Sequence, residues 1–163
     1  MKFVRKVVRD TLPEPADIVI TTSAGYPLDT TFYQSIKGLT AAAPIVKKGG
    51  TIILAAQCES GLGSEEFTTL ATDARELETI IKELVSERVF IIDQWQFEKF
   101  AQARRKADII LVAEGIPVQQ KNRMHLRWTE TVQEALALAL KQHGPNARVA
   151  VIPKGPYILA EIE

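Results

Sequence analysis

Apolar residues gather in two kinds of segment that alternate along the chain. Five short runs are apolar almost throughout and rich in β-branched residues, as in strands buried on both faces of a parallel sheet. These runs lie at residues 17–20, 51–56, 88–92, 108–112 and 148–152. Four intervening segments space their apolar side chains three and four positions apart, as helices do when one face is buried. They lie at residues 30–43, 67–85, 94–105 and 131–143.

The order of these segments predicts the fold class. Each crossover between parallel strands must lie on a face of the sheet and cover it. The alternation therefore predicts an α/β fold, a three-layer sandwich with a mainly parallel, Rossmann-like sheet. Residues 124–128 alternate between apolar and polar side chains and are expected to form an edge strand.

Local signals mark where two of the helices begin and end. Thr131 followed by Glu134 matches a capping box, and Gly144 is expected to end that helix. Asp93 followed by Gln96 repeats the opening signal before the helix expected at 94–105.

The chain is expected to form one α/β domain over residues 16–163. Residues 1–15 carry two prolines and a basic stretch, and we interpret them as a leading segment or linker stub. Gly49–Gly50 indicates a tight loop that leads into the strand expected from residue 51.

Composition and charge exclude several classes of function. Twenty basic side chains balance twenty acidic ones, so no net field favours a nucleic acid or an anionic membrane. No apolar run approaches the roughly 18 residues that cross a bilayer. Cys58 is the only cysteine, which excludes an internal disulfide and agrees with a reducing compartment, so a cytoplasmic location is expected.

Candidate chemistry lies in the segments that follow each strand, because open parallel sheets bind ligands beyond the carboxyl ends of their strands. In the first helix, Phe32, Ile36, Leu39 and Ala43 form the stripe that must face the sheet. Tyr33, Gln34 and Lys37 share another face. A phenol, an amide and an ammonium together suit a small carboxylate or hydroxy acid. The alternative is an ordinary solvated helix face.

Trp95 is a second candidate. The helix that contains it is expected to pack through Phe97 and Phe100, so the indole must point elsewhere, either into a cleft or across the end of the sheet.

The remaining reactive or glycine-rich positions give weak signals. Gly61–Gly63 lacks the third glycine of a dinucleotide fingerprint and indicates a plain turn. Cys58 has no histidine nearby in sequence, and we expect it to be a small core residue without a catalytic role. His125 and His143 are not spaced as metal ligands, so no metal site is expected.

Two tracts of the sequence resemble the carboxy-terminal domain of the nickel-pincer lactate racemase family. Residues 16–63 carry GYPLD followed by FYQSIK, and residues 93–115 continue the resemblance from DQWQFEKF onward. Such a domain implies a substrate-orienting role for Tyr33, Gln34, Lys37 and Trp95, with no catalytic residue of its own.

The same resemblance implies what must accompany this domain. Family members invert a carbon that bears a hydroxyl, by reversible hydride transfer to a nickel-pincer nucleotide attached through an amino-terminal catalytic domain. The expected partners are that domain, in the same or a separate chain, and a small 2-hydroxy acid. The chain alone is expected to be inactive and to bind no cofactor. Two alternatives stay open: a stand-alone sensor of small carboxylates, and a fragment of a nucleotide-binding oxidoreductase.

Overall fold

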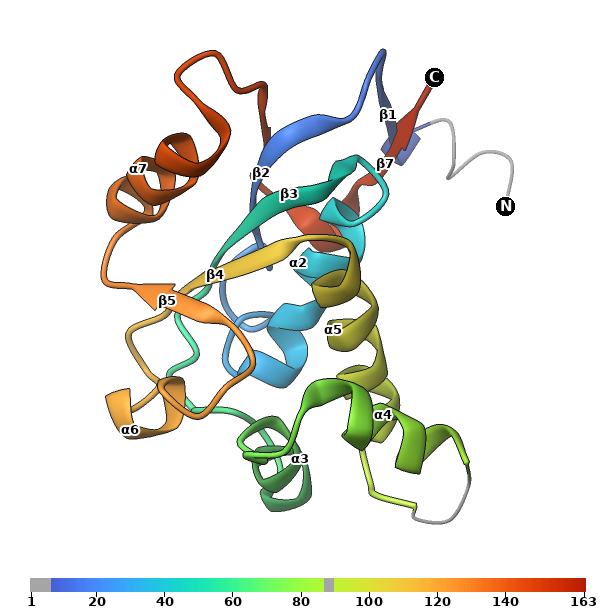
Figure 1. Ribbon diagram of the computed structural model, residues 1–163, viewed down its shortest axis with the longest axis vertical. Coiled ribbons are helices and arrows are strands. Elements are labelled where there is room, and N and C mark those ends of the chain that lie inside the picture. Colours follow the sequence, from blue (N-terminus) through green and yellow to red (C-terminus); the bar gives the residue numbers. More distant parts are fainter. Residues whose placement is uncertain (1–6, 87–89) are drawn as a thin grey trace.

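The computed structural model describes residues 7–86 and 90–163, and its centre is a five-stranded parallel sheet (Figure 1). The strand order is β5-β4-β3-β2-β6. These strands are β2 (Ala16–Thr22), β3 (Val46–Ala55), β4 (Asp108–Val112), β5 (Arg127–Thr129) and β6 (Val149–Ile152). Every neighbouring pair runs parallel, which confirms the expected α/β class.

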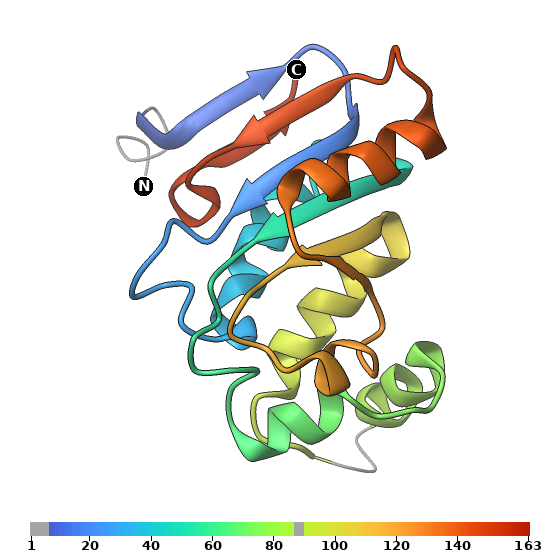
Figure 2. The same ribbon diagram turned by 90° about the vertical axis from the view of Figure 1, so that its left-hand side faces the viewer.

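Helices cover the sheet on two faces. The helices are α2 (Phe32–Ala42), α3 (Glu65–Ala71), α4 (Leu77–Val85), α5 (Gln94–Lys106), α6 (Val118–Lys121) and α7 (Val132–His143). In Figure 1, α2 and α5 lie to one side of the sheet and α7 to the other, and Figure 2 shows α7 in front of the strands. This arrangement follows from the crossovers, because the chain steps from β2 to β5 in one direction and then returns to β6.

The two faces bury hydrophobic cores of different size. The larger core lies under α2, α3, α4 and α5 and contains the fully buried rings of Phe32, Phe67 and Phe100. The smaller core packs three isoleucines of β2, β3 and β4 against Ala135 and Ala139 of α7. As expected, Phe32, Ile36 and Leu39 of α2 face the sheet and are fully buried.

A second, two-stranded sheet joins the two ends of the described chain. β1 (Arg9–Leu12) runs parallel to β7 (Leu159–Ile162), which follows the short 3-10 helix η1 (Gly155–Tyr157). Residues 9–12 thus pair with the carboxy-terminal strand. The boundary between a leading segment at 1–15 and a domain at 16–163 stays a prediction. None of the helices described is long and apolar enough to span a bilayer.

The prediction of a strand at 88–92 is wrong for the residues that the structure describes. Residues 88 and 89 lie outside the described residues, and 90–92 belong to no strand. Phe90 is 83% exposed and Ile92 is 56% exposed, so this apolar run does not enter the sheet core. The crossover from β3 to β4 is made by α3, α4 and α5. The single helix expected at 67–85 is divided by residues 72–76, which belong to neither α3 nor α4.

Three local expectations also change. Gly49–Gly50 lies inside β3, where a register shift against β2 replaces the expected loop, and a Cβ at Gly50 would lie 2.7 Å from Asp17 O. The edge strand is shorter than expected and begins at Arg127. Asp93 stands at the N-cap position of α5, but its side chain makes no capping hydrogen bond. By contrast, the capping box of Thr131 and Glu134 and the stop at Gly144 are confirmed.

Candidate functional site

The first turn of α2 is held by the loop that follows β3. Thr31 caps the helix by accepting a hydrogen bond from Gln34 N at 3.2 Å. The next two backbone N–H groups donate to that loop, Phe32 N to Gly61 O at 3.0 Å and Tyr33 N to Leu62 O at 2.9 Å. All of these donors would be orphaned in an isolated helix. The Gly61–Gly63 loop is therefore a structural support for α2, in agreement with the expected plain turn.

Tyr33 and Trp95 lie in direct contact. Their ring centroids are 5.8 Å apart in an edge-to-face arrangement, and Phe67 of α3 meets Tyr33 in the same way at 5.3 Å. The Trp95 indole is 52% exposed, whereas Phe97 and Phe100 are buried, so the indole points away from the core as expected. The start of α2 and the start of α5 thus form one aromatic corner.

Gln34 and Lys37 form a polar pair next to that corner. Lys37 Nζ donates to Gln34 Oε1 at 2.6 Å, which holds the ammonium toward the first turn of α2. Both side chains are partly buried. The structure therefore brings the four residues singled out from the sequence onto adjacent turns of α2 and α5.

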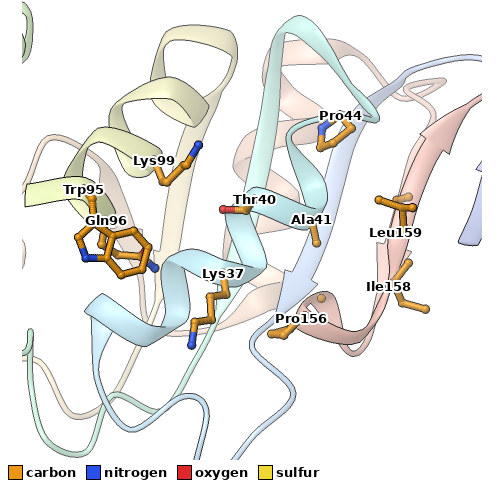
Figure 3. Close-up of a pocket in the computed structure, with 12 residues that line it drawn as sticks. Lys37, Thr40, Ala41, Pro44, Trp95, Gln96, Lys99, Pro156, Ile158 and Leu159 are labelled. Atoms are coloured by element: carbon orange, nitrogen blue, oxygen red, sulfur yellow. The ribbon is translucent and has the colours of Figure 1, made fainter. Parts of the chain in front are cut away.

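A groove of about 350 Å³ runs along the exposed side of α2, with Lys37 and Trp95 at its edge (Figure 3). Thr40, Ala41 and Pro44 line the groove along α2. Trp95, Gln96 and Lys99 of α5 stand on one side, and Pro156, Ile158 and Leu159 stand on the other. Its volume lies in the range of small-molecule sites, and its walls are mainly apolar.

Burial raises the pKa of the Tyr33 phenol above its usual value, and the nearby Asp93 carboxylate raises the pKa further. Both effects disfavour the phenolate. Tyr33 is therefore protonated at neutral pH and can donate a hydrogen bond. With the Lys37 ammonium one turn away, the face presents donors that suit an anionic oxygen.

Sequence reasoning missed the residues that support Tyr33. Gln96 is 2% exposed, and its Nε2 donates to Tyr33 O at 2.9 Å. Ser64 Oγ caps α3 and donates to Asp93 Oδ2 at 2.8 Å. The polar Gln96 on a buried helix stripe was the available signal, because buried amides need hydrogen-bond partners.

A second hollow of about 580 Å³ lies at the carboxyl ends of the strands. Its polar lining includes Asp29, Gln57, Glu114 and Glu130. This is where an open parallel sheet is expected to bind ligands. The Lys37 groove is separate and extends along α2 and α5.

The cysteine and histidine side chains considered from the sequence lie outside the Lys37 groove. Burial raises the pKa of the Cys58 thiol to about 11, so it is a poor nucleophile at neutral pH. His143 pairs with Thr51 Oγ1 at 2.9 Å. Within residues 7–86 and 90–163, no three His, Cys, Asp or Glu side chains group as metal ligands. The described residues thus offer no ligand set that would hold a metal ion through protein groups alone.

Comparison with known proteins gives consistent matches. A family model described as the lactate racemase C-terminal domain matches residues 12–160. The lactate racemase of Lactiplantibacillus plantarum is 35% identical over 147 residues, which cover 89% of this chain and 35% of that protein. The lactate racemase of Thermoanaerobacterium thermosaccharolyticum is 32% identical over 148 residues, which cover 90% and 35%.

Solved structures agree with the sequence matches. The lactate racemase apoprotein from Thermoanaerobacterium thermosaccharolyticum superposes with a TM-score of 0.90 at 30% identity, covering 98% of this chain and 38% of that one. A Thermotoga maritima protein shares the fold at a TM-score of 0.63 and 13% identity, over 99% and 40% of the two chains. This chain thus spans about a third of the length of the curated relatives it matches.

Proposed function

The chain belongs to the lactate racemase C-terminal domain family, and from this we propose that it orients the substrate of a nickel-dependent 2-hydroxyacid racemase or epimerase. The relatives extend well beyond the matched region, which supports a partner domain on the amino-terminal side. We propose that this partner domain carries the reacting groups and the nickel-pincer nucleotide. The described residues hold no ligand set for that metal, so we assign this chain no step of its chemistry.

The observation that carries the proposal is the joint placement of Lys37 and Trp95 at one groove, with Tyr33 against the indole. The Lys37 ammonium would attract the substrate carboxylate, and the Gln34 amide would hold that ammonium in place. The Tyr33 phenol would donate to a second substrate oxygen. A preorganised pair of donors stabilises negative charge without reorganising during the reaction.

The experiment compares this chain alone with a protein that joins it to the amino-terminal part found in its relatives. Each is supplied with a single enantiomer of a panel of 2-hydroxy acids, and chiral chromatography measures inversion. We expect inversion by the joined protein, loaded with nickel cofactor, and none by the chain alone. A loaded protein that inverts no 2-hydroxy acid would contradict the proposal.

The second candidate is a sensor of small carboxylates that lacks catalysis, which the same donors of Tyr33, Gln34 and Lys37 would also serve. Calorimetric titration of the chain alone with a 2-hydroxy acid separates the two. Tight binding by the chain alone, together with no inversion by the joined protein, would favour the sensor.

A further inference from the structure

Asp93 adopts a backbone conformation that residues with a Cβ rarely take. Its φ is +69°, in the left-handed region, at the first position before α5. Asp and Asn tolerate this region better than most residues, but it still costs free energy. The Asp93 carboxylate makes no capping hydrogen bond to α5, so helix capping does not offset this free energy. Strained residues of this kind are held by their surroundings and often serve a site.

The Asp93 carboxylate is instead turned toward the start of α3. Ser64 Oγ donates to Asp93 Oδ2 at 2.8 Å. Ser64 Oγ also accepts from Phe67 N at 3.2 Å, as the N-cap of α3. Ser64 thus links the first turn of α3 to the first residue before α5. Phe67, on that turn of α3, packs against Tyr33.

The residues that follow Asp93 contact Tyr33 from α5. Trp95, two positions later, packs its ring edge to face with the Tyr33 ring. Gln96, three positions later, donates to Tyr33 O at 2.9 Å. Tyr33 is therefore in contact with the starts of two helices, α3 and α5, and the Ser64 to Asp93 hydrogen bond links these two helix starts.

We propose that Asp93 is a positioning residue for Tyr33: fastened by Ser64, it holds the starts of α3 and α5 together and so fixes the phenol between them. The placement of Tyr33 does not depend on the reaction. The consequence for turnover rests on the proposed function.

The charges around the phenol agree with this role. Within residues 7–86 and 90–163, the Asp93 carboxylate adds to the effect of burial in raising the Tyr33 pKa, whereas a hydrogen bond with Trp95 lowers it. Lys37, one turn along α2, is engaged by Gln34 Oε1. Phe67 and Trp95, the other side chains packed on the ring, carry no charge.

The test neutralises Asp93 without changing its shape. Asn tolerates the same positive φ and can still accept from Ser64, so Asp93→Asn removes only the charge. The matched control is Glu98→Gln, which neutralises another acid of α5 whose Oε1 accepts from Gln94. The chain has three tyrosines, of which Tyr26 and Tyr157 are exposed, and Tyr33→Phe identifies the signal of the partly buried Tyr33.

Ultraviolet titration of the tyrosines in the isolated chain gives the first readout. We expect Asp93→Asn to lower the Tyr33 pKa, because it removes the negative charge beside the phenol, and Glu98→Gln to leave it unchanged. An unchanged Tyr33 pKa in folded Asp93→Asn would overturn the proposal. Ser64→Ala supplies a second readout, because it removes the hydroxyl that donates to Asp93 Oδ2 and keeps the carboxylate. The ring signals of Tyr33 should shift in this variant, and signals that match the wild type would also overturn the proposal.

In the protein joined to its amino-terminal part, Asp93→Gly tolerates the positive φ but removes the carboxylate that accepts from Ser64, so it should lower kcat roughly ten-fold and change KM little. Asp93→Asn, which can still accept from Ser64, should lose less. Full kcat in Asp93→Gly would remove the link to turnover. A wild-type protein without racemase activity would contradict the proposed function, while the Tyr33 titration would still decide the role of Asp93.

Discussion

The two faces of the sheet are stabilised by different kinds of contact. The face under α7 is a small apolar contact of three isoleucines with Ala135 and Ala139, and its helix has its own capping box. The face under α2 and α5 has a larger core, and polar side chains such as Gln96 tie its helices together. The α7 face can be stabilised by local sequence and simple packing. The α2 and α5 face needs contacts between distant segments, and it carries the candidate site.

The largest expected effect is on the stability of the α2 and α5 face. Phe32 is fully buried, with Phe67 at 6.3 Å and Phe100 at 5.7 Å between ring centroids. Phe32→Ala should lower the free energy of unfolding by about 3–5 kcal/mol, because it leaves a cavity in the main core. Urea denaturation followed by circular dichroism measures the change. On the α7 face, Leu138→Ala should cost far less, since Leu138 is 43% exposed, and equal losses would contradict the comparison.

The next effect separates function from stability on the same face. In the protein joined to its amino-terminal part, Lys37→Ala should lower kcat roughly 100-fold or more, because a positioned positive charge is lost. Thermal unfolding should change little.

Lys99→Ala is the matched control, since Lys99 lines the same groove but is exposed and donates to Gln102 Oε1 at a long distance of 3.4 Å. Its kcat should stay within about three-fold of the wild type. Equal losses for Lys37→Ala and Lys99→Ala would show that general groove charge, and not the Lys37 position, matters.

The buried Cys58 thiol should make the stability of the larger core depend on pH. Burial raises the pKa of the Cys58 thiol to about 11 in the folded chain, above that of a free thiol. The neutral thiol therefore leaves the free energy of unfolding at its full value below pH 9, and this free energy falls as the pH rises toward 11. Relative to Cys58→Ala, wild-type stability should fall by roughly 2–3 kcal/mol over that range. Guanidinium denaturation at several pH values measures the difference. Parallel stability curves for the two proteins would contradict the burial of the thiol.

The smallest effect belongs to the α7 face. Thr131→Ala removes the hydroxyl that accepts from Glu134 N at 3.2 Å, and it should cost about 1 kcal/mol. Chemical denaturation measures the loss against Gln133→Ala, an exposed neighbour whose change should stay within about 0.5 kcal/mol. A loss as large as that of Phe32→Ala would mean that α7 depends on its cap as much as the larger core depends on its rings.

The same contrast explains what the sequence could predict. The limits of α7 were predicted to within one residue, because Thr131 and Gly144 are local signals. β4 was predicted over its full length of 108–112 because it is a buried apolar run. The run at 88–92 looked alike, but Phe90 and Ile92 are exposed, and only tertiary packing decides which apolar runs enter the sheet. β1 and β7 are short and half exposed, and they pair only with each other among the described strands, so neither had a clear pattern.

Part of the candidate site was also predictable. Helical spacing was enough to place Tyr33, Gln34 and Lys37 on one face, and the hydrophobic stripe of α5 was enough to turn Trp95 outward. The contact between Tyr33 and Trp95 joins residues 62 positions apart and could not be read from either helix alone. Their substrate-orienting role stays a prediction.

The most direct test of that role uses the two tryptophans of the chain as separate reporters. Trp95 lies at the groove, whereas Trp128 lies in β5, where its Nε1 donates to Asn122 Oδ1. In the protein joined to its amino-terminal part, their indole N–H signals can be assigned by Trp95→Phe and Trp128→Phe. Titration with a 2-hydroxy acid that the protein inverts should shift the Trp95 signal and leave Trp128 unchanged. A Trp95 signal that does not respond to saturating substrate would contradict the account.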